Sequence, residues 1–135
     1  MNGVRFAAFL IISAAVAATN GNALASDAGD DEWIIYAEKA NGDLYFYDPS
    51  RVQRSSTLRH VWNGIRYKTS VMGASSFLSL LEIDCSERTQ RTLQSTFFTD
   101  AHWENAAMKT DTKEKPKKEI AVGSTTERLA QIVCD

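Results

Sequence analysis

The stretch from Ser124 to Asp135, "STTERLAQIVCD", decides the fold because it predicts a short helix that has to pack against something. Ser124 and Glu127 form a capping-box pattern, in which the Ser124 hydroxyl accepts from the Glu127 amide while the Glu127 carboxylate reaches back to the Ser124 amide. Apolar residues then follow at helical spacing, at Leu129, Ile132 and Val133. A helix of about ten residues is shorter than the ~12 to 15 residues at which isolated helices become stable. We therefore expect it to be docked on the rest of the chain.

The N-terminus predicts export. Residues 1–25 contain Arg5, then an apolar run over residues 6–18, then the small-x-small triplet that ends at Ala25. This is the pattern of a secretory signal peptide that is cleaved after Ala25. The apolar run is shorter than the ~20 residues that span a bilayer, so we expect no membrane span after cleavage. No cysteine lies near the cleavage point, so we expect a periplasmic or secreted protein without a lipid anchor.

The two cysteines of the chain, Cys85 and Cys134, are predicted to form a disulfide. Exported chains meet an oxidising compartment, where a cysteine pair is usually bridged. The bridge encloses 48 residues and is worth about 4 kcal/mol in the chain-entropy model. It would hold the helix against the strand that ends at Cys85. With His60 and His102 the cysteines make a formal Cys2His2 set, but no pair has the short spacing of zinc motifs, so we expect no metal and no cofactor.

Charge and size exclude several classes of protein. The chain has 15 basic and 17 acidic residues, and removal of residues 1–25 takes away one arginine and no acid, which leaves a net charge of about −3. A general nucleic-acid binder would need a strong basic excess, so we expect no nucleic-acid partner. Residues 26–32, "SDAGDDE", read as a disordered acidic leader. Residues 33–135 have the length of a single domain.

Antiparallel strands account for most of this domain. The β-rich runs 33–39 and 43–48 flank Asn41-Gly42, which is the strongest short-range hairpin signal. A third strand covers residues 57–68, and its Asn63-Gly64 is either a second turn or a bulge. Further strands are predicted over residues 77–84, 90–100 and 119–122.

The strand before Cys85 has two distinct faces. With a period of two, one face is expected to be buried and carries Phe77, Ser79, Leu81, Ile83 and Cys85. The other face, with Leu80, Glu82 and Asp84, is expected to be solvated. The predicted fold class is therefore α+β, with a five- to six-stranded antiparallel sheet and a C-terminal helix that the disulfide staples across one face.

The order of these motifs resembles the surface-adhesin protein E family of Gram-negative bacteria. The resemblance runs from Trp33 to Cys134 and rests on "YFYDP", "VW", "EIDC" and above all the closing unit "PKKEIAVGSTTERLAQIVC". It implies an antiparallel sheet whose concave face is covered by a C-terminal helix that the Cys85–Cys134 bridge fastens. The best-known member is a dimeric outer-membrane lipoprotein that binds extracellular-matrix and plasma proteins of the host. The resemblance thus implies adhesin-like recognition.

Non-catalytic recognition of a protein partner is the first functional hypothesis. The segment 102–118 combines an aromatic side chain with lysines on a predicted solvated loop, which suits an acidic, extended partner. An alternative is that the tryptophan lies in the core and the loop only keeps the chain soluble. The candidate partner-binding residues are Trp103, Lys109, Lys113, Lys115, Lys117 and Lys118. An exposed sheet edge offers a second route, in which two copies pair as a homodimer.

Two other functions are weighed against partner binding. A periplasmic envelope or stress protein would bind a small apolar ligand under the helix, in a pocket lined by Tyr36, Tyr45, Tyr47, Phe97 and Phe98. These aromatic residues more often form the core itself. An enzyme is expected least, because there is no nucleophile elbow and no phosphate-binding loop. Glu82 and Asp84 resemble a carboxylate pair, yet salt bridges to nearby arginines explain them better.

Overall fold

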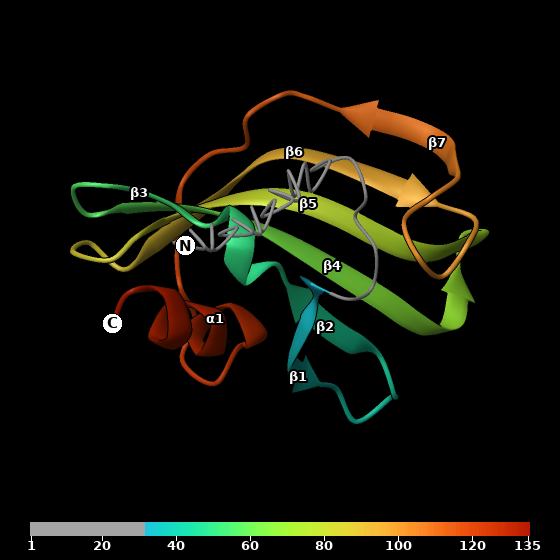
Figure 1. The fold of residues 1–135 in the computed structure, drawn as a ribbon, viewed down its shortest axis with the longest axis horizontal. Coiled ribbons are helices and arrows are strands. Elements are labelled where there is room, and N and C mark those ends of the chain that lie inside the picture. Colours follow the sequence, from blue (N-terminus) through green and yellow to red (C-terminus); the bar gives the residue numbers. More distant parts are fainter. Residues whose placement is uncertain (1–31) are drawn as a thin grey trace, which may run out of the picture.

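One antiparallel sheet and one helix make up the domain (Figure 1). The computed structural model describes residues 32–135, apart from the side chains of residues 106–109. The strand order is β1-β2-β4-β5-β6-β7, with β3 paired to β4 and β8 paired to β6. The elements are β1 (Ile34–Glu38), β2 (Leu44–Tyr47), the 3-10 turn η2 (Pro49–Arg51), β3 (Gln53–Ser55), β4 (Leu58–Val71), β5 (Ala74–Asp84), β6 (Thr89–Phe98), β7 (Ala106–Asp111), β8 (Lys118–Glu119) and α1 (Thr125–Val133). The antiparallel sheet and C-terminal helix are confirmed, but the strand number was wrong, because the sheet has eight strands rather than five or six.

The additional strands carry little hydrophobic signal. β3 has no apolar residue, and all three of its residues are exposed. It forms because it pairs with the start of β4, with Gln53 opposite His60. β7 occupies a region for which no strand was predicted, and β8 begins one residue before the predicted strand 119–122. Such strands are determined by pairing with distant residues rather than by their own periodicity.

The β1–β2 hairpin forms at Asn41-Gly42 as predicted. Gly42 has a φ of 94°, which glycine adopts without strain, and the Asn41 side chain accepts a hydrogen bond from the Asp43 amide at 3.0 Å. The register between β1 and β2 shifts between Ile35 and Ala37, so β1 carries a bulge.

Asn63-Gly64 is neither a turn nor a bulge. Both residues lie inside β4, where Asn63 pairs with Tyr47 and Ser79 and Gly64 continues the same registers. The buried Asn63 side chain accepts from the Tyr36 hydroxyl at 2.5 Å. A Cβ on Gly64 would lie 2.6 Å from the ring of Trp103. Asparagine is therefore used here for a buried hydrogen bond, and glycine makes room for an indole.

Helix α1 begins at the predicted cap. The Glu127 amide donates to the Ser124 hydroxyl at 3.1 Å. The reciprocal half of the capping box differs from the prediction, because the Glu127 carboxylate accepts from the Gly123 amide at 3.1 Å instead of the Ser124 amide. The predicted apolar stripe is also corrected, since Ile132 is 39% exposed while the buried helix residues are Leu129, Ala130 and Val133.

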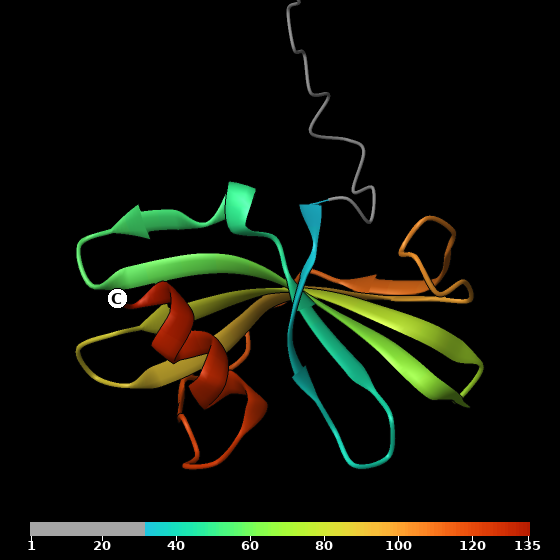
Figure 2. The same cartoon turned by 60° about the horizontal axis from the view of Figure 1, so that its bottom comes forward.

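The end of α1 is fastened in two ways. The Cys85–Cys134 disulfide is present, with Cα atoms 5.6 Å apart, so the predicted staple is confirmed. In addition, Arg54 and Arg59 donate to the Val133 carbonyl at 2.9 and 3.0 Å. The last carbonyls of a helix have no partner within the helix, and cations at this end also interact favourably with its dipole. Figure 2 shows α1 lying against one half of the strongly twisted sheet.

The two faces of the sheet carry separate hydrophobic clusters. Between α1 and the sheet lies the larger cluster, which consists of Tyr36, Tyr45, Val61, Leu81, Ile83, Ile120, Leu129, Ala130 and Val133. The second cluster contains Trp33, Phe46, Phe98 and Trp103, with Leu44, Trp62 and Leu78 packed against it. Both faces are thus partly covered, which explains why β5 has buried residues on each of them.

Candidate partner-binding surface

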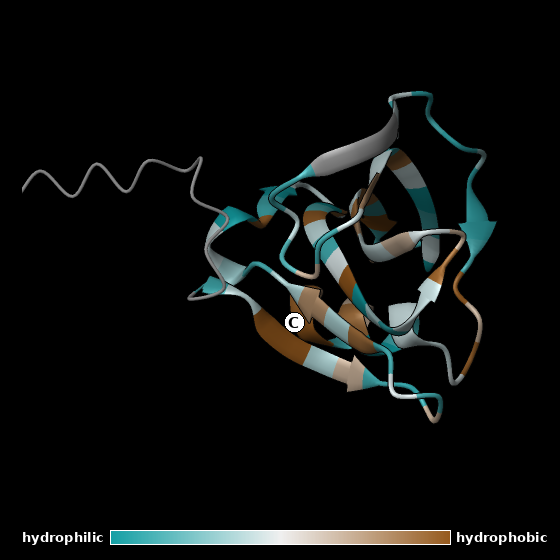
Figure 3. Ribbon diagram, turned by 90° about the vertical axis from the view of Figure 1, so that its right-hand side faces the viewer, coloured by the Kyte–Doolittle hydropathy of each residue, from teal (hydrophilic) through white to brown (hydrophobic). Residues whose placement is uncertain are grey.

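The predicted lysine loop is attached to the sheet. We call residues 112–118, which follow β7 and end at the first residue of β8, the lysine segment. The Lys115 amide donates to the Thr92 carbonyl of β6 at 2.9 Å, and Lys118 pairs with Gln90. The segment is exposed, as predicted, and Figure 3 shows it as a hydrophilic run along one side of the molecule. The predicted solvated loop is thus attached to the edge of β6 at Lys115 and at Lys118.

The acidic neighbours of the lysine segment are already engaged. The Lys115 ammonium pairs with Asp111 at 2.7 Å, and Glu114 pairs with Arg91 of β6 at 3.2 Å. Among the described residues, no ion pair involves the exposed lysines Lys113, Lys117 and Lys118. The side chain of Lys109 lies outside the described residues. Lys117 is close enough to Asp84 to contribute to its lowered pKa, and the segment as a whole still has an excess of lysines over carboxylates.

Trp103 lies in the core and not on the surface. Its side chain is 5% exposed, and its ring centroid lies 4.7 Å from that of Trp33 and 5.4 Å from that of Phe46. The structure therefore agrees with the alternative that placed this tryptophan in the core, and an exposed aromatic anchor is not formed. Its backbone has a φ of 57°, which is uncommon for a residue with a side chain.

Asp100 holds the loop that carries Trp103. Its carboxylate accepts from the amides of His102, Glu104 and Asn105 at 2.8 to 3.1 Å. Burial alone would raise the pKa of Asp100, but these amide hydrogen bonds lower it below its usual value. Gly64 was the sequence signal that could have predicted the burial of Trp103, because it leaves room for the indole. The contact joins residues 39 positions apart, however, so the glycine alone does not identify its partner.

Glu82 is buried instead of solvated. It is 6% exposed, and its two oxygens accept from Arg91 at 2.8 Å and bond to His60 Nε2 at 2.8 Å. Burial by itself would raise the pKa of Glu82, while the hydrogen bonds from Arg91 and His60 lower it. The predicted pairing with an arginine is confirmed, and the expected solvated environment was wrong.

Asp84 has a different task from Glu82. Its carboxylate accepts from the Ser86 and Glu87 amides, both at 3.0 Å, and so caps the turn between β5 and β6. These amide hydrogen bonds, that of Glu87 first, lower the pKa of Asp84. The two carboxylates are therefore engaged separately in holding the fold.

A second charged cluster lies near η2. Asp48 is 2% exposed and accepts from the Ser50 amide and hydroxyl and from Arg51 Nε. Burial would raise the pKa of Asp48, but the hydrogen bonds from Ser50 and Arg51 lower it. The Arg51 guanidinium lies 5.6 Å from the Trp33 ring and 5.5 Å from the Trp62 ring. Sequence reasoning did not predict this cluster: Asp48 and Trp62 belong to the quoted "YFYDP" and "VW" motifs, but their contacts with Arg51 depend on the fold.

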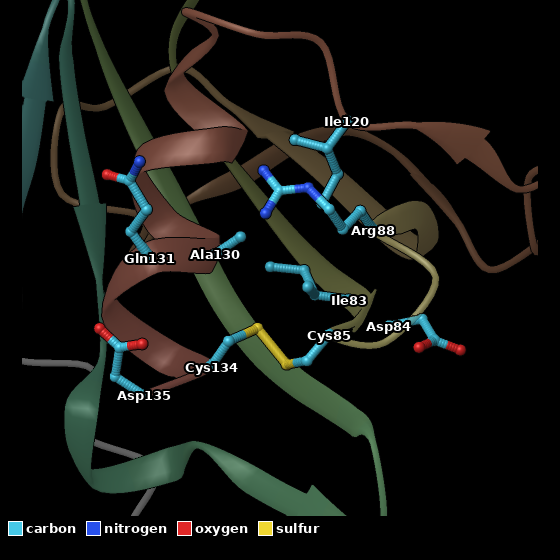
Figure 4. A pocket seen from close by; sticks show the side chains of 9 residues that line it. All are labelled: Ile83, Asp84, Cys85, Arg88, Ile120, Ala130, Gln131, Cys134 and Asp135. Carbon is cyan, nitrogen blue, oxygen red and sulfur yellow. A yellow bond between two sulfur atoms is a disulfide. The ribbon is translucent and has the colours of Figure 1, made fainter.

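The pocket under the end of the helix is too small for the predicted apolar ligand, and a larger cleft of about 630 Å³ at the start of the helix has mainly polar side chains in its wall, among them Glu38, Glu127 and Arg128. A pocket of about 120 Å³ lies next to the disulfide, where Ile83, Arg88 and Ala130 are among its lining residues (Figure 4). Ligand pockets usually measure roughly 300 to 1,000 Å³. The five aromatic residues proposed to line such a site are divided: Tyr36, Tyr45 and Tyr47 pack in the larger cluster, Phe98 in the second, and Phe97 against Phe77. The structure does not bring them together around a cavity.

The edge strand β1 is partly covered. Arg128 of α1 donates from Nε to the Tyr36 carbonyl, which removes one acceptor from the free edge. Ile34 and Ile35, in contrast, are 48% and 53% exposed. Over residues 32–135, no helix is long and apolar enough to cross a membrane.

The fold is shared with solved structures of Haemophilus influenzae protein E. One is 15% identical and matches over 76% of this chain and 83% of its own, with a TM-score of 0.60. The structure of its selenomethionine form is 16% identical and matches over 76% of this chain and 85% of its own, with a TM-score of 0.61. A structure of protein E from non-typeable Haemophilus influenzae is 15% identical and matches over 76% of this chain and 75% of its own, with a TM-score of 0.59. At these identities the likeness concerns the fold alone.

Family membership rests on the sequence. No curated protein sequence matches the chain. The model of the family described as surface-adhesin protein E matches residues 33–135, which is the whole folded domain and more than half of the chain. The chain therefore belongs to the surface-adhesin protein E family.

Proposed function

We propose that this adhesin-like surface protein is a non-catalytic receptor for an acidic segment of a protein partner, which it binds through the lysine segment. The family supports an exported, adhesin-like role. The observation that carries the proposal is that Lys113, Lys117 and Lys118 are exposed and outside any described ion pair, on a backbone that pairing to β6 holds in place.

The arrangement favours binding for two physical reasons. A segment that is already ordered loses less conformational entropy on association than a mobile loop. Because Glu114 and Asp111 are satisfied by Arg91 and Lys115, they oppose an acidic partner less than unpaired carboxylates would. Recognition at this edge also leaves both hydrophobic clusters closed.

Binding to immobilised poly-L-glutamate tests the proposal. The chain as a whole is acidic, with a net charge of −2, so it should bind this polymer only if a local cationic surface acts. The double variant Lys113→Glu/Lys117→Glu should lose most of the binding at low salt. The matched variant Lys39→Glu/Lys68→Glu makes the same change in charge at two other exposed lysines and should retain more. Equal losses in both variants, or no binding by the parent protein, would contradict the proposal.

Export and anchoring are part of the same proposal. We infer that residues 1–25 are removed, that residues 26–32 form an acidic leader, and that the mature N-terminus carries no lipid. The signal-peptide pattern and the family's surface role support export, and the lack of a cysteine near Ala25 supports a mature N-terminus without lipid.

Self-association through β1 is a second proposal. The exposed Ile34 and Ile35 on an edge strand favour pairing with a second copy. Sedimentation equilibrium should show a dimer that Ile35→Lys weakens. A monomer at all concentrations tested would rule out this pairing.

A further inference from the structure

We propose that a pocket between η2 and β4 binds a carboxylated sugar residue, such as a uronic or a sialic acid, of an acidic glycan. This Arg51 pocket has a volume of about 440 Å³, and its wall includes Arg51, Val52, Gln53, His60, Trp62 and Leu80. The volume lies within the usual range of ligand sites. None of these residues belongs to the lysine segment, so the inference does not rest on the proposed protein partner.

Arg51, which is ion-paired with Asp48, supplies the hydrogen-bond donor that would recognise a carboxylate. Asp48 engages only its Nε atom, and among the described residues no hydrogen bond engages either terminal nitrogen. One of these, Nη2, is shielded from solvent without an acceptor. A buried donor without a partner is unfavourable, whereas the side chain as a whole is still 28% exposed. Asp48 and the two indoles thus hold the guanidinium in place, and because Nη2 is shielded from solvent, Nη1 is the terminal nitrogen that a carboxylate can reach.

His60 and Gln53 supply partners for hydroxyl groups. His60 Nε2 bonds to the carboxylate of Glu82, which can only accept when it is ionised, so Nε2 carries a proton and Nδ1 is the ring nitrogen left for a ligand. The Gln53 amide offers both donors and an acceptor from the exposed strand β3. A ligand that satisfies these groups has to donate and accept hydrogen bonds.

The remaining wall is apolar. Trp62, Leu80 and Val52 line the pocket and are each only partly buried. The C–H face of a sugar ring packs on such a surface while its hydroxyls point to the polar wall. A simple fatty or aromatic acid would satisfy Arg51 but would leave Gln53 and His60 without partners. The combination of an arginine, an amide, an imidazole and an indole therefore favours an acidic sugar over an apolar acid.

Titration of the purified, disulfide-bonded protein followed by NMR tests this assignment. The probes are methyl β-D-glucuronide and methyl α-N-acetylneuraminide, with methyl β-D-glucoside and benzoate as controls. The indole N–H signal of Trp62 is assigned by its loss in Trp62→Phe. This signal should shift when at least one of the two acidic sugars is added. The sugar that causes the shift shows whether the pocket prefers a uronic or a sialic acid. The glucoside and benzoate should bind about tenfold more weakly, because each lacks one part of the recognition.

Variants separate the pocket from the fold. Arg51→Lys keeps a cation beside Asp48 but removes the Nη1 donor that faces the pocket. It should therefore weaken binding of the acidic sugar about tenfold and leave glucoside binding unchanged. Gln53→Ala changes an exposed residue and should weaken binding of both the acidic sugar and the glucoside. Gln131→Ala removes an exposed amide from the helix and should weaken binding of neither. The assignment is overturned if no acidic sugar shifts Trp62, if glucoside or benzoate binds equally well, or if Arg51→Lys and Gln53→Ala behave like Gln131→Ala.

Discussion

Single residues explain the departures from local sequence signals. Gly64 follows an asparagine, which usually indicates a turn, yet it lies in the middle of β4 beneath the Trp103 ring. Trp103 in turn has a positive φ that Asp100 helps to maintain. Glycine and indole thus form a matched pair, because the ring occupies the space that any side chain at position 64 would need.

Gly64→Ala should destabilise the fold by about 1 to 3 kcal/mol, because its methyl group would overlap the indole. Urea unfolding measures the loss. The same substitution in a Trp103→Phe background should cost less, because the smaller ring leaves room. Additive costs in this double-mutant cycle would contradict the account of the pair.

Glu82 gives the fold a dependence on acid pH. Its pKa is lowered in the folded state, so its contribution to stability is present above the unfolded pKa of about 4.3 and is lost as the pH falls through the folded value. Asp48 and Asp100 act in the same direction. Stability should therefore decrease below about pH 4.

Glu82→Gln should reduce stability at pH 7, since it removes the charge that pairs with Arg91, and should make the acid decline shallower. Urea midpoints measured from pH 3 to 7 provide the test, with the exposed Glu119→Gln as the control. An unchanged slope below pH 4 in Glu82→Gln would show that this carboxylate does not control the decline.

At the scale of elements, the sequence predicted what local chemistry controls. The β1–β2 hairpin follows from Asn41-Gly42, and the start of α1 follows from Ser124. β3, β7 and β8 were missed or displaced, because their pairing depends on β4 and β6. Of the candidate surface, the exposure of the lysines was predictable. The burial of Trp103 was one of two alternatives that the sequence left open. The attachment of the lysines to β6 was not predictable, since it depends on contacts distant in sequence.

The end of α1 has two attachments of different kinds. The disulfide reduces the conformational entropy of the unfolded chain, while Arg54 and Arg59 donate hydrogen bonds to the Val133 carbonyl in the folded state. The helix has nine residues and contributes three buried side chains to the larger cluster. Loss of its attachment would therefore expose apolar residues of the sheet.

Replacing both cysteines, Cys85→Ser/Cys134→Ser, should lower the free energy of unfolding by about 4 kcal/mol, which is the loop-entropy value for a bridge of this span. Urea unfolding of the variant and of the oxidised parent gives the difference. The exposed Ser86→Ala serves as a neighbouring control. Equal stability of the double variant and the parent would show that the bridge does not fasten the helix.

For the whole molecule, the local arrangement of charge matters more than its sum. The net charge is −2, yet the lysine segment carries an excess of exposed lysines along the edge of β6. The Arg51 pocket lies instead between η2 and the sheet, with Trp62 and Leu80 in its wall. Both features need an exported chain if they are to meet partners outside the cell.

The most direct test of the account is where the protein resides and in what covalent form. The measurement combines cell fractionation, protease accessibility on intact cells and intact mass. We expect the chain outside the cytoplasm and accessible at the cell surface or in the medium, beginning at Ser26 and lighter by two hydrogens for the disulfide. A cytoplasmic protein that retains residues 1–25 and two free thiols would contradict the account.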